Sequence, residues 1–409
     1  MYERTLALNR MFGGGDRQMR FISGPRQSGK TTLAKTVLRA KRCDRLYFNW
    51  DDRSLRRRLR DEPDFLWSEL RRQVGGPKLA WVCMDEIHKA SKWRDLLKGW
   101  FDRHEREARF LVTGSARLEW VRRAGDSLAG RYFLFHLYPL TLREALGRPR
   151  PIPPSKDAAR WVETSADKGR FEPGAVDSLM RFGAFPEPFA RQSAAFVRKW
   201  HESYIDLLVR EDLRDLSRIA DLDSMAALFE LLPSRIGSPL SLNSLRGDLA
   251  VSHTAIRHYV VTLALGYVLF EIRPWASNIA RSIKKERKVY LFDWTDVPSE
   301  AARFENMVAH ELLALTAAWN DAGLGRFELR YVRTRLGKET DFLIVSAGRP
   351  WLLIETKLSD QAIDSHHRSH AAALGGIPVI QVCRSDNVLR RESPRSYRLS
   401  ASRLFSAAL

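Results

Sequence analysis

The segment FISGPRQSGKTTLAK, Phe21–Lys35, contains the pattern G-x-x-x-x-G-K-T from Gly24 to Thr31. Residues 19–23 before it read as a strand, and residues 31–39 after it read as a helix. The two glycines let the backbone curl so that its N–H groups face an anion, and the N-terminus of the helix adds partial positive charge. In this context the pattern is typical of a loop that binds the phosphates of a nucleotide. We expect the contacting residues to be Gly24, Pro25, Arg26, Gln27, Ser28, Gly29, Lys30, Thr31 and Thr32.

The end of a second apolar run supports a nucleotide site. Residues 79–89, LAWVCMDEIHK, are apolar up to Asp85 and Glu86. Runs that are apolar on both faces are typical of central parallel strands, and ligands bind beyond the carboxyl ends of such strands. We expect Thr31 and Asp85 to bind Mg²⁺ there. Lys30 would then reach the β- and γ-phosphates, and Glu86 would orient and polarise the attacking water.

A third apolar run, FLVTGS at residues 110–115, ends in small polar side chains. If this run forms a neighbouring strand, Ser115 or Thr113 can sense the γ-phosphate of the nucleotide. Ordinary helix capping explains such a strand end equally well for Ser115, and both interpretations stay open.

Several motifs together resemble a known family. GPRQSGKT, VCMDE and TGS resemble the Walker A, Walker B and sensor 1 motifs of AAA-type ATPases. The further stretches DEIHK, TGSARL, LAGR with LYPLTLREA, RFGAFPEPF and VREDLRDL resemble, in that order, prokaryotic ATPases in which an AAA domain precedes a C-terminal domain of unknown function. The resemblance extends over nearly the whole chain. It implies an α/β P-loop NTPase domain with a parallel sheet, and ATP and Mg²⁺ as cofactors.

ATP hydrolysis in such proteins often needs an arginine that stabilises charge on the transferred phosphoryl group. Arg131 in LAGR is the first candidate and Arg117 in TGSAR is the second. Either can equally be an ordinary surface residue, because the chain has 68 lysines and arginines. If the arginine acts on a neighbouring chain, the protein must form a homo-oligomer.

The charge of the chain favours a polyanionic partner. The net charge is +19 and the isoelectric point about 10.1, and DNA is the partner that we expect, although a GC-rich coding sequence can also enrich arginine. The longest apolar stretch, residues 259–270, is too short to span a bilayer, so we expect no membrane partner. Three separated cysteines without a CxxC pair and an N-terminus without a signal peptide favour a cytoplasmic protein.

Composition divides the 409 residues into four expected parts. Residues 1–146 are the AAA-type P-loop ATPase domain. Residues 147–222 hold a proline-rich excursion, GRPRPIPPSKD, which cannot continue a helix or central strand, followed by a helical lid or linker. We expect the excursion to be exposed over residues 147–172. Residues 223–297 read as a winged helix-turn-helix, and residues 298–409 as an α/β nuclease-like domain.

The winged helix-turn-helix carries the residues that we expect to bind DNA. Ser252 begins its second helix and Gly266 ends it, which fits helix punctuation. The N-terminal residues of this helix face bases in the major groove in such proteins, and a basic wing tip suits phosphates. The candidates are His253, Thr254, Arg257, His258, Lys284 and Lys285. The alternative is a lid or a protein-docking module.

TDFLIV (residues 340–345) and WLLIETK (residues 351–357) read as a hairpin with a tight connection at Gly348. Symmetric antiparallel pairing places Val345 opposite Trp351 and Asp341 opposite Glu355. Directly opposed like charges destabilise a strand pair. Alternation puts Lys357 on the same face as the two acids. A register slip of one residue would destroy this convergence.

A divalent cation between Asp341 and Glu355 would remove that repulsion, and Mg²⁺ suits such carboxylates. Glu305 on a preceding helix is a third acid. The constellation resembles the PD-(D/E)xK nuclease fold, with Thr340 where the motif has proline. It implies catalytic roles for Glu305, Asp341, Glu355 and Lys357 in metal-dependent DNA cleavage. The alternative is a structural ion pair at a strand end. HHRSH, residues 366–370, reads as a solvated basic loop.

These observations favour an ATP-hydrolysing, DNA-associated protein whose nucleotide state is coupled to its C-terminal region. The alternative is an ATP-dependent signalling or scaffold switch whose C-terminal half binds protein and cuts nothing. A nucleotide-dependent kinase or transferase is the third interpretation, and the motifs offer no acceptor site for it.

Overall fold

The computed structural model describes residues 2–74, 79–114, 128–208, 222–276 and 286–407. The chain forms two compact units, and we describe each by itself. The first unit is Leu6–Tyr138, and the second consists of Met1–Thr5 with Pro139–Leu409. Among the described residues, no helix is both long and apolar enough to cross a membrane.

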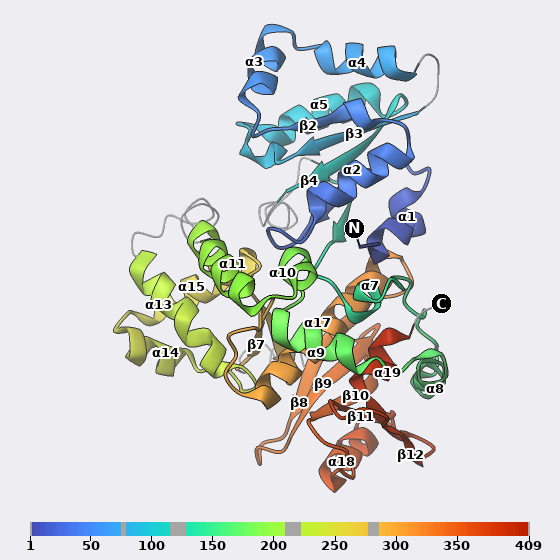
Figure 1. The fold of residues 1–409 in the computed structure, drawn as a ribbon, viewed down its shortest axis with the longest axis vertical. Coiled ribbons are helices and arrows are strands. Elements are labelled where there is room, and N and C mark those ends of the chain that lie inside the picture. Colours follow the sequence, from blue (N-terminus) through green and yellow to red (C-terminus); the bar gives the residue numbers. More distant parts are fainter. Residues whose placement is uncertain (1, 75–78, 115–127, 209–221, 277–285, 408–409) are drawn as a thin grey trace. The chain divides into compact units, whose positions relative to one another are not determined.

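The Leu6–Tyr138 unit is an α/β domain around a parallel sheet (Figure 1, blue to teal). The five strands have the order β2-β3-β4-β1-β5, and every neighbouring pair is parallel. Every residue of β1 and β3 is buried, which is why these segments read as continuous apolar runs. The strands are β1 (Met19–Ser23), β2 (Tyr47–Asn49), β3 (Ala80–Asp85), β4 (Ala108–Thr113) and β5 (Tyr132–His136). The helices are α1 (Arg10–Gly13), α2 (Lys30–Ala40), α3 (Arg53–Asp61), α4 (Phe65–Val74) and α5 (Trp93–His104), with 3₁₀ turns η2 (Asp44–Leu46) and η3 (Ile87–Lys89).

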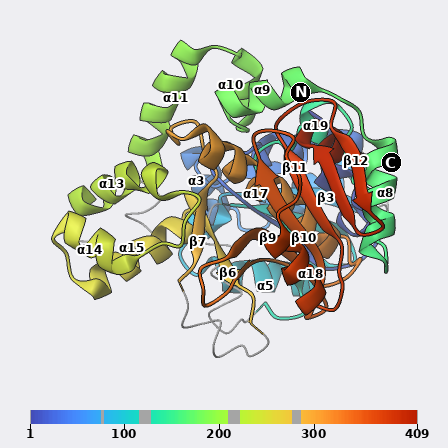
Figure 2. The ribbon, with the colours of Figure 1, turned by 90° about the horizontal axis from the view of Figure 1, so that it is seen from below.

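The second unit contains a mixed eight-stranded sheet with the order β12-β13-β11-β10-β9-β8-β6-β7. The long helix α17 (Glu300–Asp321) packs on its strands β7, β8, β9 and β10. Helix α18 (Ser365–Ala373) packs on β9, β10 and β11 (Figure 2). The strands are β6 (Leu269–Pro274), β7 (Lys288–Leu291), β8 (Phe327–Arg333), β9 (Glu339–Ser346), β10 (Arg349–Lys357), β11 (Val379–Cys383), β12 (Leu389–Ser393) and β13 (Ser396–Ser400).

Helices precede the sheet in this unit. They are α7 (Leu142–Ala145), α8 (Ala158–Lys168), α9 (Pro173–Phe182), α10 (Pro186–Arg191), α11 (Ala194–Leu207), α13 (Leu222–Leu231), α14 (Leu242–Leu249) and α15 (His253–Leu265), with α19 (Ala401–Ser406) at the end of the chain. The exposed excursion expected at residues 147–172 is wrong for α8. Trp161 is 4% exposed and packs against Trp319 and Trp351 with ring centroids 5.5 and 5.6 Å away. The proline-rich stretch does interrupt regular structure, as expected, but the helix that follows it buries an apolar face.

Helices α13, α14 and α15 lie beside the β6–β7 hairpin (Figure 2). Ser252 caps α15 by accepting a hydrogen bond from the Ala255 N–H at 3.1 Å, and Gly266 follows its last residue, as the sequence predicts. Strand β6 also pairs with β8, through Arg273 and Pro274. The eight-stranded sheet therefore crosses the expected boundary between residues 297 and 298. The winged-helix assignment and the four domain boundaries stay predictions.

The β9–β10 hairpin turns through Ala347 and Gly348, both with positive φ, 48° and 79°. Positive φ at both central residues is typical of the tight turns that connect antiparallel strands. The expected pairing of Val345 with Trp351 is wrong, because Val345 pairs with Pro350. A bulge between Pro350 and Leu352 shifts the register by one residue, so that Leu353 pairs with Leu343. The bulge brings the far end of the hairpin back to the predicted register, with Asp341 beside Glu355.

Candidate functional site

The loop between β1 and α2 has the curled backbone that its glycines predict. Gly24 and Gly29 have φ of 157° and 97°. A Cβ atom on Gly24 would lie 2.1 Å from the carbonyl oxygen of Leu137, so only glycine fits there. The Lys30 ammonium group donates to the carbonyl oxygens of Gly24 and Pro25, at 2.8 and 2.6 Å. The lysine therefore folds back over the loop that is expected to hold the phosphates.

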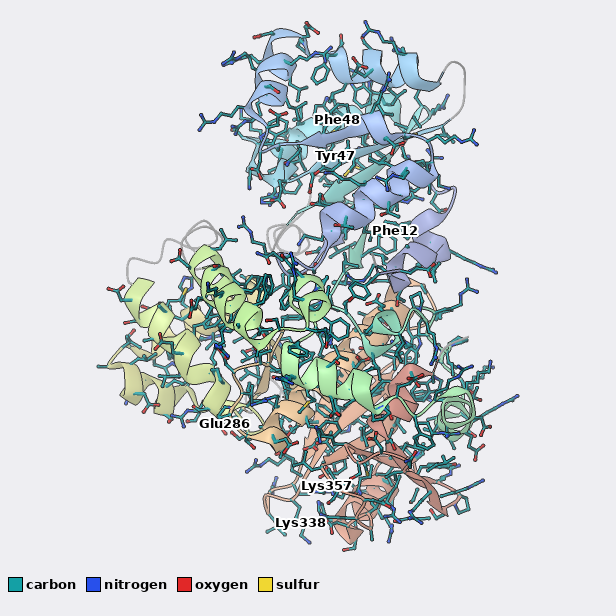
Figure 3. All side chains as sticks on the ribbon, viewed as in Figure 1. Phe12, Tyr47, Phe48, Glu286, Lys338 and Lys357 are labelled. Atoms are coloured by element: carbon teal, nitrogen blue, oxygen red, sulfur yellow. The ribbon has the colours of Figure 1, made fainter. Side chains whose placement is uncertain are left out.

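The carboxyl ends of β1, β3 and β4 meet at one edge of the sheet, because these strands are parallel neighbours. Asp85 ends β3, is 2% exposed, and accepts a hydrogen bond from the Thr31 hydroxyl at 2.8 Å. Its other oxygen accepts from the Thr113 hydroxyl. The Tyr47 hydroxyl of β2 donates to the same oxygen as Thr31 (Tyr47 is labelled in Figure 3). The fold thus gathers three hydroxyl groups around one buried carboxylate.

Glu86 follows Asp85 in a left-handed backbone conformation, with φ of 56°. Burial raises the pKa of its carboxyl group, and the nearby charge of Lys30 opposes that shift. One of its oxygens lies 3.5 Å from His88 Nε2 and 3.8 Å from the Lys89 ammonium group. The structure therefore brings Lys30, Thr31, Asp85 and Glu86 to one edge of the sheet. A hydroxyl and a carboxylate are oxygen ligands that suit Mg²⁺, so Thr31 and Asp85 fit the expected ion.

Three further residues were expected at this site. Ser115 and Arg117 fall outside the described residues, and Arg131 lies at the other end of β1. The Arg131 carbonyl oxygen accepts from the N–H of Met19, the first residue of β1, whereas the nucleotide loop follows its last residue. These ends are four residue steps apart, or about 13 Å at a strand rise of about 3.3 Å per residue. The Arg131 side chain is paired with Asp102 at 2.7 Å. It cannot reach a nucleotide on its own chain, and action on a neighbouring chain stays a prediction.

Sequence reasoning missed Tyr47. The short strand β2 gives little periodic signal, because its burial alternates over only three residues. The pairing of Asn49 with Asp85 is what places the phenol near the carboxylate. Burial raises the pKa of Tyr47, as does its hydrogen bond to Asp85, so the phenol remains a neutral donor.

In the second unit, Glu305, Asp341, Glu355 and Lys357 lie together, as the sequence predicts. Sequence reasoning missed a fifth residue that lies among these four, Lys288 of β7. Its side chain is 0% exposed, and its ammonium group lies 2.8 Å from Glu305, 2.7 Å from Glu339 and 3.4 Å from Asp341. Burial alone would lower the pKa of Lys288, but the Tyr290 phenol and these carboxylates raise it well above its usual value. A protein cation thus already neutralises part of this cluster.

The hydrogen bonds of Asp341 and Glu355 hold the hairpin end together. Asp341 accepts from the Thr356 N–H and hydroxyl, at 2.9 and 2.6 Å. Glu355 accepts from the Lys357 ammonium group at 2.8 Å (Lys357 is labelled in Figure 3). Burial, and then the charge of Asp341, raises the pKa of Glu355 to about 8. The expected Mg²⁺ does not fit this donor set well, because the buried Lys288 ammonium group lies beside one oxygen of Asp341 and Thr356 donates twice to the other.

Residues 366–370 are not the solvated basic loop that the sequence predicts. They belong to α18, and His367 and His370 are buried, 1% and 7% exposed. Nδ1 of each ring lies 2.8 Å from the Thr340 hydroxyl. The run of polar letters gave no apolar period, but these two imidazoles face β9 three residues apart on one side of the helix.

The expected DNA contacts divide in two. His253, Thr254, Arg257 and His258 are all exposed on the N-terminal half of α15. Lys284 and Lys285 fall outside the described residues.

Comparisons with known proteins bear on the first unit most directly. Residues 16–146 match the family model described as an AAA domain. The match supports an AAA-type P-loop domain in this part of the chain. Residues 174–295 match a model described only as a domain of unknown function (DUF8612). That match ends within the second unit, before α17.

Sequence relatives match along most of the chain. Two uncharacterized proteins, from Mycobacterium bovis and Mycobacterium tuberculosis, are each 27% identical over 363 residues, which is 85% of this chain and 72% of theirs. Among solved structures, the Aeropyrum pernix ORC1 protein in complex with DNA has 15% identity and a TM-score of 0.29 over 76% of this chain and 91% of its own. AMPPCP-bound DnaA from Aquifex aeolicus has 13% identity and a TM-score of 0.32 over 63% of this chain and 85% of its own. TM-scores of this size do not establish a shared fold.

Proposed function

We propose that the Leu6–Tyr138 unit binds ATP with Mg²⁺ and hydrolyses it. The observation that carries this proposal is the Asp85 carboxylate beside the Thr31 hydroxyl, 2.8 Å apart, next to the curled loop that holds Lys30. Bound Mg²⁺ would supply charge neutralisation at the phosphates. The backbone N–H groups of residues 24–31 and the Lys30 ammonium group would orient the phosphates. The Glu86 carboxylate would orient the attacking water and accept a proton from it as a general base.

ATP turnover by a Lys30→Ala variant tests this proposal. We expect hydrolysis to fall to background and the affinity for a fluorescent ATP analogue to drop, with unchanged circular dichroism. Arg39→Ala on the same helix is the control, because its side chain is 71% exposed and lies only near Asp44. Unchanged turnover in Lys30→Ala would refute the site.

We also propose that the protein associates with DNA, with the exposed face of α15 as part of the contact. The support is the net charge of +19 and the exposure of His253, Thr254, Arg257 and His258. DNA affinity should fall steeply with salt, since cation release from phosphates drives such binding. An Arg257→Gln variant should bind labelled duplex DNA less tightly at low salt, whereas Arg335→Gln, an exposed arginine in the β8–β9 connection, should not. No binding at low salt would favour the scaffold alternative.

For the polar cluster around Lys288, we propose a structural charge network without DNA cleavage. Lys288 pairs with Asp341, an expected Mg²⁺ ligand, and with Glu305, the expected third acid. Incubation of the full chain with labelled DNA, ATP and Mg²⁺ should therefore leave the DNA intact. Cleavage that disappears in Asp341→Ala would overturn this proposal and restore the nuclease interpretation. Homo-oligomerisation and a cytoplasmic location stay predictions.

A further inference from the structure

The start of helix α18 holds metal-ligand side chains that the proposed ATPase does not use. Asp364, His366 and His367 each offer a ligand atom, and these three atoms all lie within 4.8 Å of one another. They pack near the end of β10, where Glu355 lies. Donor atoms around a tetrahedral zinc ion lie about 3.4 Å apart, given bonds of about 2.1 Å. The spacing at α18 needs only small side-chain adjustments to reach that geometry.

One ring nitrogen of His367 is buried and makes no hydrogen bond within the described residues. The side chain is 1% exposed, and its Nε2 atom makes no hydrogen bond with any described residue. This atom lies 3.5 Å from Glu355 Oε1 and 4.0 Å from Asp364 Oδ2. Leaving a buried polar atom without a partner costs about 1–3 kcal/mol. A cation held between this nitrogen and the two carboxylates would satisfy all three groups.

The other nitrogen of each histidine is already held, which is the arrangement that metal-binding histidines show. His366 Nε2 lies 3.1 Å from the Glu339 carbonyl oxygen, which can only accept, so this nitrogen carries the proton and Nδ1 keeps its lone pair. His367 Nδ1 lies 2.8 Å from the Thr340 hydroxyl. His366 Nδ1 is thus available to a ligand. His367 Nε2 is available when His367 Nδ1 donates to the Thr340 hydroxyl and that hydroxyl donates to His370 Nδ1.

Asp364 is at the N-cap position of α18, where an aspartate usually accepts a hydrogen bond from the first turn of its helix. Its carboxylate makes no such bond within the described structure. The oxygen near His367 Nε2 is therefore available. Glu355 can complete the set, because the Lys357 side chain bonded to it is 31% exposed and can turn toward solvent.

We propose that Asp364, His366 and His367, completed by Glu355, bind a divalent transition-metal ion, with Zn²⁺ as the best match. Two imidazole nitrogens with two carboxylates suit zinc, whereas Mg²⁺ prefers oxygen ligands alone. The site is separate from the nucleotide loop and does not rest on ATP hydrolysis. It also differs from the expected Mg²⁺ position, because its central ligand is His367 and not Asp341.

Isothermal titration of the full chain with Zn²⁺, after treatment with a chelator and without nucleotide, tests the proposal. We expect one Zn²⁺ to bind per chain with a Kd in the micromolar range or below, and Mg²⁺ to bind at least a hundred-fold more weakly. His367→Gln and His366→Ala should each weaken Zn²⁺ binding at least ten-fold. His258→Ala, which removes an exposed histidine of α15, is the matched control and should bind as the unaltered chain does.

Because His367 is buried, its variant could misfold, so Asp364→Asn carries the test independently. Its side chain is 61% exposed, and the substitution should weaken Zn²⁺ binding about ten-fold with unchanged circular dichroism. Equal Zn²⁺ affinity in Asp364→Asn, His366→Ala and the unaltered chain would overturn the proposal, since zinc would then bind other histidines. So would the absence of saturable binding, or a Mg²⁺ affinity equal to that for Zn²⁺.

Discussion

Both units gather acidic side chains in their interiors, but they neutralise them differently. Asp85 is surrounded by the hydroxyl groups of Thr31, Tyr47 and Thr113, which donate hydrogen bonds and carry no charge. Glu305, Glu339 and Asp341 instead surround the buried ammonium group of Lys288. A carboxylate held by neutral donors keeps its charge for an incoming cation, whereas carboxylates around a lysine are already paired. On the functions proposed here, the first arrangement serves binding and the second serves stability.

Replacing Lys288 should have the largest effect on this contrast. Removing one partner of a buried charge pair leaves the other charges uncompensated, so Lys288→Met should lower the free energy of unfolding by about 3–5 kcal/mol. Urea unfolding of the full chain measures this. Lys338→Met is the control, because Lys338 is an exposed lysine in the β8–β9 connection (Figure 3) and should change little. A stable Lys288→Met protein that binds Mg²⁺ would instead show that the lysine only fills a metal position.

Asp85 should behave in the opposite way. Asp85→Asn keeps one acceptor oxygen for the Thr31 and Tyr47 hydroxyl groups. It presents an N–H group to the Thr113 hydroxyl, which can accept. The substitution removes the charge, but stability should change little. ATP hydrolysis should fall about 100-fold, the scale for losing an electrostatic group of an active site. Steady-state turnover at saturating Mg²⁺ measures this, with Asp44→Asn, a 57% exposed carboxylate, as the control. If the variant loses stability and keeps turnover, Asp85 is structural and the contrast fails.

His201 of α11 also lies between carboxylates, as Lys288 does, but its charge can change with pH. Its ring nitrogens lie 2.8 Å from Asp293 and 2.8 Å from Asp296. Burial opposes its protonation, but the hydrogen bonds to both carboxylates raise the pKa of His201 from 6.5 to about 10. Because the pKa is raised in the folded state, this stabilisation is fully present below pH 6.5 and is lost as the pH rises through about 10.

His201→Gln should therefore destabilise the protein by about 2 kcal/mol at pH 6 and by less at pH 10. Urea unfolding at several pH values measures the difference, with the exposed His258→Gln as the control. A destabilisation that does not depend on pH would mean that His201 packs as a neutral ring.

The smallest effect is expected for Tyr47. Tyr47→Phe removes one of the three donors to Asp85 and should lower ATP hydrolysis about five-fold, equivalent to about 1 kcal/mol for one hydrogen bond. Tyr132→Phe, at the start of β5, removes a hydroxyl group from the opposite edge of the sheet and is the control. An effect as large as that of Asp85→Asn would show that the phenol positions the carboxylate and does more than solvate it.

The sequence predicted the parts of each site that lie on one segment or on adjacent strands. The nucleotide loop is a local pattern, and the strand of Asp85 is a buried apolar run. The hairpin of Asp341 and Glu355 was also local, although the bulge at residues 350–352 had no visible sequence signal. Lys288 was out of reach, because KVYLFDW (residues 288–294) reads as a wing strand of the expected winged helix. Only the β6–β8 pairing and the packing of α17 place that strand beside Glu305.

The same limit applies to the histidines of α18. The segment HHRSH indicates only polarity. Nothing in it shows that Thr340, on strand β9, hydrogen-bonds to both His367 and His370. Trp161 illustrates the converse, since a proline-rich stretch concealed a buried aromatic cluster with Trp319 and Trp351. Contacts between distant segments follow the same physical rules, but the sequence does not tell which residues will meet.

The parallel pairing of β6 with β8 has a practical consequence for anyone who expresses this protein in pieces. A fragment that begins at residue 298 would lack β6 and β7, so β8 would become the outer strand of the sheet. Its unpaired backbone groups would be a template for joining another copy. The same cut would remove Lys288 and leave Glu305, Glu339 and Asp341 to repel one another. Such a fragment should aggregate, whereas one that begins before α13 retains both strands.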